Sequence, residues 1–212
     1  MKGQILELFL TAFTTLFVAV GPLEVVPLFL ALTGNASAKE RRSVALTATG
    51  TASAVLFLFA FGGVQLLGLL GVGLPAFRTA GGILLMMVAA DLLLAKHSGI
   101  SSITTQEEQE AKNRAGIAVV PLAIPLIAGP GSMTAIVLLM SKVHTIAQGA
   151  AVMAALVIVM ALTLLCMLSG GRLMKILGVT GSNAVARVSG ILLAALAMQF
   201  IFDGLSASRL FG

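Results

Sequence analysis

The sequence predicts an all-α polytopic membrane protein with six transmembrane helices, and three observations lead to this fold class. Hydrophobic residues make up 58% of the 212-residue chain, whereas charged residues make up 10%, less than half the share in a soluble domain. Mean hydropathy is +1.09. Long charge-free windows separate the charges, and a spanning helix needs about 20 apolar residues. A soluble globular fold is therefore excluded.

The charge-free windows place the helices in order along the chain, with Glu24 as a single acid inside the first one. A polar segment from His97 to Arg114 separates the third helix from the fourth and is predicted as a loop. We expect one transmembrane domain over residues 1–212. The expected helices cover approximately residues 5–33, 44–70, 76–95, 117–141, 146–171 and 186–204.

The distribution of Lys and Arg predicts the orientation. With six spans, the connections after the first, third and fifth helices share one side of the membrane. That side carries nine basic residues: Lys39, Arg41, Arg42, Lys96, Lys112, Arg114, Arg172, Lys175 and Arg187. The other side carries four: Lys2, Arg78, Lys142 and Arg209. The positive-inside rule then places the first set in the cytoplasm and both termini outside, in the cell inner (plasma) membrane.

The first segment has an alternative interpretation as a signal peptide, because Lys2 precedes an apolar run. Glu7 in the charged region and the lack of an A-x-A cleavage site argue against it.

The residue counts exclude several function classes. One cysteine and two histidines cannot build a Cys/His metal cage, so no metal or other cofactor is expected. The basic residues are scattered between apolar runs, which favours a lipid bilayer as partner and excludes nucleic acid. The chain contains no G-x-x-x-x-G-K-[ST], H-E-x-x-H or G-x-S-x-G motif, so we expect no enzymatic activity.

Three landmarks align at one shift of 108 residues, which predicts an internal duplication of the chain. The alternative is that Gly and Leu are simply common in membrane helices. Three helices per copy would turn the second copy upside down relative to the first, as in inverted-repeat transporters. The copies cover about 1–97 and 115–212, with a linker at 98–114. The aligned landmarks are Gly21-Pro22 with Gly129-Pro130, Gly62-Gly63 with Gly170-Gly171, and Gly82-Ile83-Leu84-Leu85 with Gly190-Ile191-Leu192-Leu193.

Helices 1 and 4 are predicted to be broken at equivalent positions. Gly21-Pro22 lies inside the first apolar stretch, and Gly129-Pro130-Gly131 lies inside the fourth. Proline removes a backbone donor and glycine tolerates the dihedral angles of a break. Inside a membrane such a break survives only in protein or beside water, so the pair points to one central cavity. A proline kink that only shapes packing is the alternative for each break.

These breaks supply the candidate binding residues. The half-helix after each break offers free amides to a carboxylate, and the carbonyls before it offer oxygens to Na⁺ or an ammonium group. The expected site comprises Gly21, Pro22, Glu24, Gly129, Pro130, Gly131, Ser132 and Thr134. Glu24 occupies the place in the first copy that Ser132 occupies in the second. Its alternatives are a cation or proton site, an ion pair with another helix, or a residue that snorkels to a nearby face.

Asp91 and Gln199 also occupy equivalent positions and are candidates for gating or coupling. Asp91 has an equally good interpretation as an interfacial residue paired with Lys96 or His97. Asp203, near the outer end of the last helix, is interpreted as solvated.

Four segments resemble the MarC family of six-helix inner-membrane proteins, which is distantly related to LysE-type exporters. The most specific are VPLAIPLIAGPGSMT (120–134) and GSNAVARVSGILLAALAMQFIFDGL (181–205), supported by GPLEVVPLFLALT (21–33) and RTAGGILLM (78–86). The resemblance covers essentially the whole chain and implies a transporter fold with uptake of small neutral amino acids such as glycine and alanine. It also shows a departure: the first break in the family is commonly Asn-Pro or Asp-Pro, whereas this chain has Gly21-Pro22. A carboxylate at the position of Glu24 is not typical of the family either.

Together these observations predict a secondary transporter for a small zwitterionic solute, with a neutral amino acid as the expected substrate and Na⁺ or H⁺ as the coupling ion. An exporter is equally compatible with inverted repeats. The alternative from another class is a non-transporting membrane scaffold or accessory subunit.

Overall fold

The computed structural model describes residues 2–33, 36–94 and 118–208, and within these ranges the secondary structure is helical, with no strand. Five helical segments are long and apolar enough to cross a membrane. They are Gly3–Val20, Ala38–Leu69, Leu74–Leu94, Ile146–Leu168 and Arg187–Ser206. This architecture is consistent with a polytopic membrane protein, which the sequence predicts.

The first broken segment consists of α1 (Lys2–Val20) and α2 (Val25–Leu32). Gly21 separates them with a φ of +61°, in the left-handed region that glycine adopts without penalty. Pro22 follows and cannot donate a backbone hydrogen bond. The helix therefore ends where the sequence predicts a break, and it resumes four residues later.

The second broken segment consists of a π-helix, η1 (Ala118–Ile127), and α7 (Pro130–Met140). Pro121 and Pro125 lie within η1, and their missing amide hydrogens interrupt any regular α-helical ladder. The Ala128 amide donates to the Ala123 carbonyl, five residues earlier, at 2.8 Å. Gly129 is extended, and Pro130 takes the first position of α7, which suits proline.

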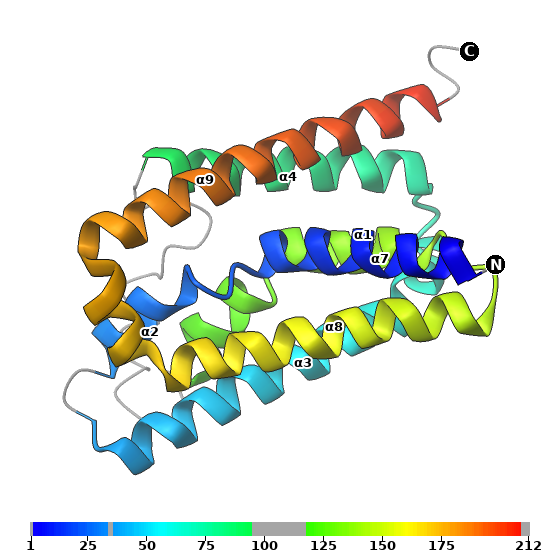
Figure 1. Cartoon of the computed structure of the whole chain (residues 1–212). Helices are drawn as coiled ribbons and strands as arrows, with labels where there is room; N and C mark the ends of the chain where they lie inside the picture. Colours follow the sequence, from blue (N-terminus) through cyan, green and yellow to red (C-terminus); the bar gives the residue numbers. More distant parts are fainter. Residues whose placement is uncertain (1, 34–35, 95–117, 209–212) are drawn as a thin grey trace.

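Two capping boxes start α3 (Ala38–Leu69) and α8 (Ile146–Leu168). At α3 the Ser37 amide donates to the Glu40 carboxylate at 2.8 Å. At α8 the Thr145 amide donates to the Gln148 side chain at 3.1 Å. In each box the hydroxyl of the first residue accepts from the backbone amide of the second. The two boxes lie 108 residues apart, and Figure 1 shows that they begin at opposite ends of the molecule.

One predicted helix limit is wrong. α3 begins at Ala38 instead of residue 44, because Ser37 caps it ahead of the basic residues. The last predicted span, 186–204, agrees with the apolar segment Arg187–Ser206, but this segment is the end of a longer helix, α9 (Gly170–Ser206), which is kinked at Gly178 with a φ of +61°. Hydropathy windows follow the apolar stretch of a helix, and a helix can continue beyond that stretch.

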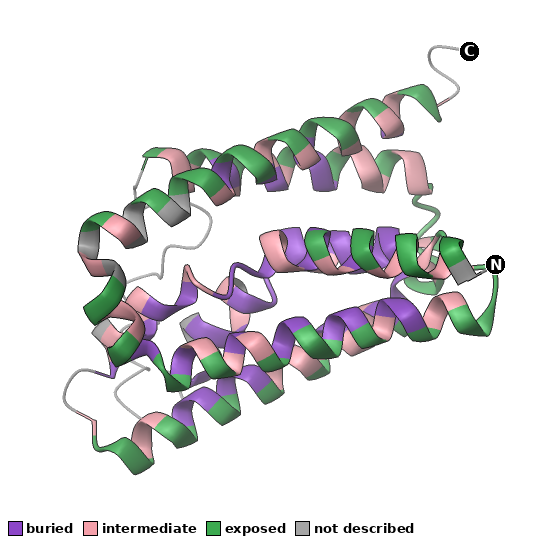
Figure 2. Ribbon diagram, viewed as in Figure 1, coloured by how far each residue is buried: buried purple, intermediate pink, exposed green. Residues whose placement is uncertain are grey.

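The helices form two packed groups (Figure 1). α4 (Leu74–Leu94) lies along α9, while α1, α3, η1, α7 and α8 share the main apolar core. Buried residues concentrate inside this second group (Figure 2). Large apolar side chains such as Leu58, Phe61 and Leu165 are exposed instead, as lipid-facing surfaces require.

The contact between α4 and α9 is reciprocal. A Cβ on Gly82 would lie 2.7 Å from both the Ala197 carbonyl oxygen and a side-chain carbon of Ile201. A Cβ on Gly190 would lie 3.1 Å from both the Ala89 carbonyl oxygen and the Leu93 side chain. Each residue of the first contact stands 108 positions from its counterpart in the second. The two glycines thus allow two backbones to approach closely at equivalent points.

Candidate functional site

The first junction, between α1 and α2, is built around the carbonyl of Gly21. This oxygen accepts from the amides of Glu24 and Val25 at 2.9 and 3.2 Å. Glu24 is the N-cap residue of α2, yet its side chain makes no capping bond. The carboxylate instead folds back over Gly21, and the Ser189 side chain of α9 lies beside it. Glu24 is half-buried.

The second junction, between η1 and α7, is held by Ser132. Its hydroxyl lies 2.8 Å from the Ile127 carbonyl oxygen and 3.0 Å from that of Gly129, and it donates to these oxygens. The side chain is 1% exposed, so the hydroxyl supplies a hydrogen bond to the buried Ile127 carbonyl at the break, whereas the Gly129 carbonyl also accepts from the Met133 amide. Ser132 therefore stabilises the junction itself.

The two junctions lie in the same group of helices. α1 packs against α7, and α2 packs against η1, so the broken segments run side by side in opposite directions (Figure 1). The sequence predicts this pairing of the breaks, and the helix contacts bring the two segments together. 

Each junction contacts one member of the α4 and α9 pair. Thr134, 3% exposed, packs against Gly81 of α4, where a Cβ would lie 2.9 Å from the Thr134 hydroxyl oxygen. Glu24 contacts Ser189 of α9. Gly81 and Ser189 are 108 residues apart and therefore occupy equivalent positions.

The two junctions differ in how many of their backbone amides are free to donate to a solute. The sequence predicts free amides after both Pro22 and Pro130. After Pro22, the amides of Glu24 and Val25 already donate to the Gly21 carbonyl, so fewer free amides remain than the sequence predicts. In α7 the Met133 amide donates to Gly129, but in the described chain neither Gly131 nor Ser132 has a backbone acceptor outside its helix. The N-terminus of α7 is thus the more available positive pole.

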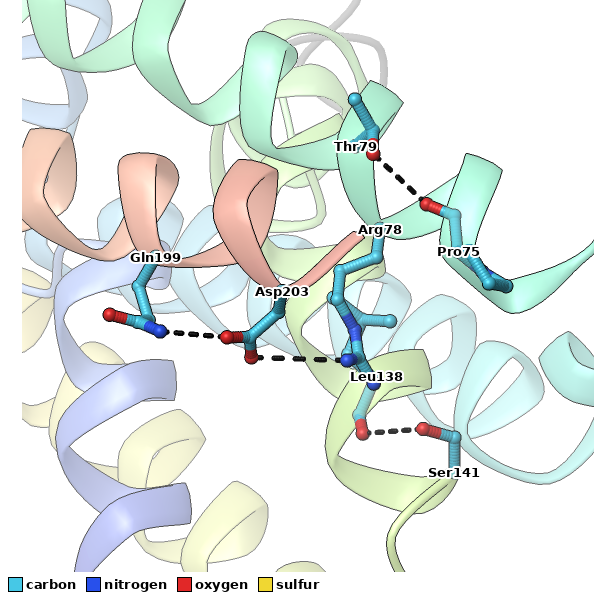
Figure 3. Close-up of polar contacts among 7 residues, drawn as sticks. All are labelled: Pro75, Arg78, Thr79, Leu138, Ser141, Gln199 and Asp203. Carbon is cyan, nitrogen blue, oxygen red and sulfur yellow. Dashed lines mark hydrogen bonds and ion pairs between the residues drawn. The ribbon is translucent and has the colours of Figure 1, made fainter. Parts of the chain in front are cut away.

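Gln199 lies away from the junctions, in a polar cluster where the start of α4 meets the end of α9 (Figure 3). It is exposed and donates to Asp203 at 2.7 Å. Asp203, which the sequence suggested was solvated, is 32% exposed and also pairs with Arg78 of α4 at 3.8 Å. The carboxylate is thus partly solvated and joins the two helices.

Asp91 is half-buried on α4. Lys96 and His97, its expected partners, lie outside the described residues. The gating or coupling role of Asp91 and Gln199 stays a prediction.

Sequence reasoning missed Gly81 on α4 and Ser189 on α9, the two residues that contact Thr134 and Glu24 of the junctions. The aligned landmark Gly82–Leu85 with Gly190–Leu193 stops one residue short of them. Extending that landmark by one position would have identified the pair. It would not have identified their contacts, which join distant parts of the chain.

Comparisons with known proteins extend over nearly the whole chain. The model of the family described as "MarC family integral membrane protein" matches residues 6–208. A UPF0056 membrane protein of Methanocaldococcus jannaschii is 34% identical over 205 residues, covering 97% of this chain and 99% of the relative. The UPF0056 membrane protein YvbG of Bacillus subtilis is 36% identical over 193 residues, covering 91% and 92%.

A third relative, the UPF0056 membrane protein YhcE of Escherichia coli, is 34% identical over 197 residues, covering 91% of this chain and 89% of the relative. No solved structure matches the chain. The resemblance seen in the sequence is confirmed: the chain belongs to the MarC family of integral membrane proteins.

Proposed function

We propose that the protein is a secondary transporter that moves a small zwitterionic solute across the inner membrane, with a neutral amino acid as substrate. The observation that carries this proposal is the pair of helix junctions in adjacent, oppositely running segments. Broken helices of this kind expose backbone dipoles to a solute and persist in a membrane only where protein or a water-filled cavity surrounds them.

Six crossings in two inverted repeats are part of the proposal. We take η1 and α7 together as the crossing that accompanies the five long helices. The two capping boxes support the repeat, because they start α3 and α8 at the same spacing and at opposite ends of the molecule. The reciprocal glycine contacts between α4 and α9 support it as well. Six crossings would put both termini on the same side, which the positive-inside rule predicts to be the outside, and the coupling ion would be Na⁺ or H⁺.

The solute would bind between the junctions. The amides of Gly131 and Ser132 at the start of α7 suit a carboxylate, and Thr134 provides a hydroxyl one turn further on. The resemblance to MarC transporters implies glycine or alanine as the first solutes to test. Transport in the export direction is equally compatible with this geometry.

A non-transporting scaffold is the second candidate, and one observation favours it. Ser132 and the amides of Glu24 and Val25 all bond to carbonyls of their own junction, as they would in a break that only fixes packing.

Solute counterflow in proteoliposomes separates the two candidates, because it reports transport in either direction without a known coupling ion. We expect preloaded glycine or alanine to drive accumulation of the labelled solute. Gly131→Val should abolish it, because a Cβ there already lies 2.6 Å from Leu85. Gly62→Val is the matched control, since nothing lies within 4 Å of a Cβ at that helix position. If no amino acid of a broad panel shows counterflow, the transporter proposal is wrong and the non-transporting scaffold remains as the candidate function.

A further inference from the structure

The carboxylate of Glu24 has an unusual position. It sits at the N-cap of α2, where a side chain normally bonds to the first amides of the helix. It makes no such bond and turns instead to Ser189 on α9. The carboxylate therefore faces a contact between two elements and is not used to start its own helix.

The two junctions consequently differ in electrostatic sign. Ser132, the equivalent of Glu24, is neutral, and the start of α7 presents the positive end of a helix dipole. At the first junction a carboxylate stands in the same position. One junction thus suits an anionic group and the other a cationic group.

A carboxylate between membrane-spanning elements is costly unless a cation balances it. Within the described residues, the ion pair joins Arg78 and Asp203, where the start of α4 meets the end of α9. Across those same residues, Glu24 has no Lys, Arg or His partner. Its carboxylate is therefore open to a bound cationic group.

The oxygens at this position match an ammonium group. No group of three acidic, Cys or His side chains able to hold a metal occurs in the described chain, so Glu24 is not part of a carboxylate-rich metal site there. An ammonium group donates three hydrogen bonds. The carboxylate oxygens are acceptors, and the Ser189 oxygen beside them is itself an acceptor.

We infer that Glu24 and Ser189 form an ammonium subsite, in which Ser189 positions the carboxylate toward the amino group of the transported solute. The inference rests on the proposed function and deepens it: the solute needs a free ammonium group as well as a carboxylate. Carboxylic acids without an amine would be poor substrates.

Binding of solute fragments to the purified full-length protein tests this subsite. Glycine carries both groups, methylamine only the ammonium and acetate only the carboxylate, and their affinities can be measured by isothermal titration calorimetry. We expect Glu24→Gln to weaken glycine binding at least about tenfold, as for loss of a hydrogen bond to a charged group, and to leave acetate binding unchanged. Ser189→Ala should weaken glycine several-fold. Glu7→Gln, at an exposed position on α1, is the charge-matched control and should bind as the wild type does.

The outcomes separate the subsite from the transporter proposal. If the wild type binds glycine and Glu24→Gln binds it equally well, the subsite is wrong and the proposed function stands. If the wild type binds no amino acid, both fail. Glu24-dependent binding of Na⁺ together with unchanged glycine binding also overturns the ammonium assignment. Should Glu24→Gln not fold, Glu24→Asp keeps the charge on a shorter side chain and should reduce glycine affinity while acetate affinity stays constant.

Discussion

Gly21 combines two constraints at one residue. Its φ of +61° is unfavourable for any residue with a Cβ, and a Cβ there would collide with the carboxylate of Glu24. To relieve that collision, the Glu24 side chain would have to move from its place beside Ser189. The shape of the backbone and the position of the carboxylate are therefore coupled at the first junction.

Gly21→Ala should accordingly destabilise the protein more than Gly71→Ala. Gly71 has a similar φ of +68°, but nothing lies within 4 Å of a Cβ there, so its substitution carries only the backbone cost of about 1 kcal/mol. The chain has no Trp or Tyr, so unfolding is best followed by the loss of the monodisperse peak in size-exclusion chromatography after heating. Equal losses of thermal stability for the two variants would mean that Glu24 is not held in place.

For individual residues, the sequence predicted which ones form the junctions but not which residues they contact. Gly21-Pro22 and Gly129-Pro130 are recognisable because glycine and proline change the backbone locally. The contact of Glu24 with Ser189 joins residues far apart in the chain, and helix packing alone creates it. The bonds from Ser132 to Ile127 and Gly129 depend on where η1 ends, and a π-helix was not predicted.

Among the elements, α4 and α9 approach each other closely at two glycines. Gly82 meets backbone atoms of α9, the Ala197 carbonyl oxygen and the Ile201 amide nitrogen, at 2.7 and 3.0 Å from the position of a Cβ. Gly190 meets the Ala89 carbonyl oxygen at 3.1 Å. Backbone atoms cannot rotate away as side chains can, so a methyl group at either glycine must push the helices apart.

This geometry predicts an order of stabilities for three alanine variants. Gly82→Ala should be the most destabilising, by about 1–3 kcal/mol as for other overpacked sites, and Gly190→Ala should follow. Gly171→Ala, where nothing lies within 4 Å, should be neutral or slightly stabilising, because Ala has the better helix propensity. Thermal stability of the three variants in one detergent gives the order. A Gly82 variant as stable as the Gly171 variant would contradict the close contact.

The helix ends show what hydropathy can and cannot predict. Apolar windows located the long helices because a bilayer requires a fixed apolar length. They placed the start of α3 too late, because α3 begins at a cap beyond its apolar stretch. They located the apolar segment Arg187–Ser206 of α9 but not the part of that helix that precedes it across the kink at Gly178. The capping boxes at Ser37 and Thr145 are local signals that would have located the starts of α3 and α8.

In the whole molecule, similar positions carry different chemistry. The spacing of 108 residues relates the capping boxes, the glycine contacts of α4 and α9, and the four residues of their shared core: Leu85 with Leu193 and Ala89 with Ala197. It also relates Glu24 to Ser132 and Gly81 to Ser189, where the residue types differ. A repeat that keeps packing residues and changes polar ones would give a nearly symmetric scaffold around an asymmetric site, as a solute with two unlike ends requires.

With the proposed inverted repeats and the orientation that the positive-inside rule predicts, the capped start of α3 would lie in the cytoplasm and that of α8 outside, and single cysteines test this directly. In a Cys166→Ser background, a membrane-impermeant maleimide should label Ala147→Cys in intact cells and Ala38→Cys only after permeabilisation, because both positions are exposed and lie at these opposite helix starts. The Cys166→Ser protein without an introduced cysteine is the control for background labelling. The reverse pattern would invert the orientation and leave the repeat intact. Labelling of both cysteines from the same side would contradict the inverted arrangement itself, since an odd number of crossings must separate the two positions.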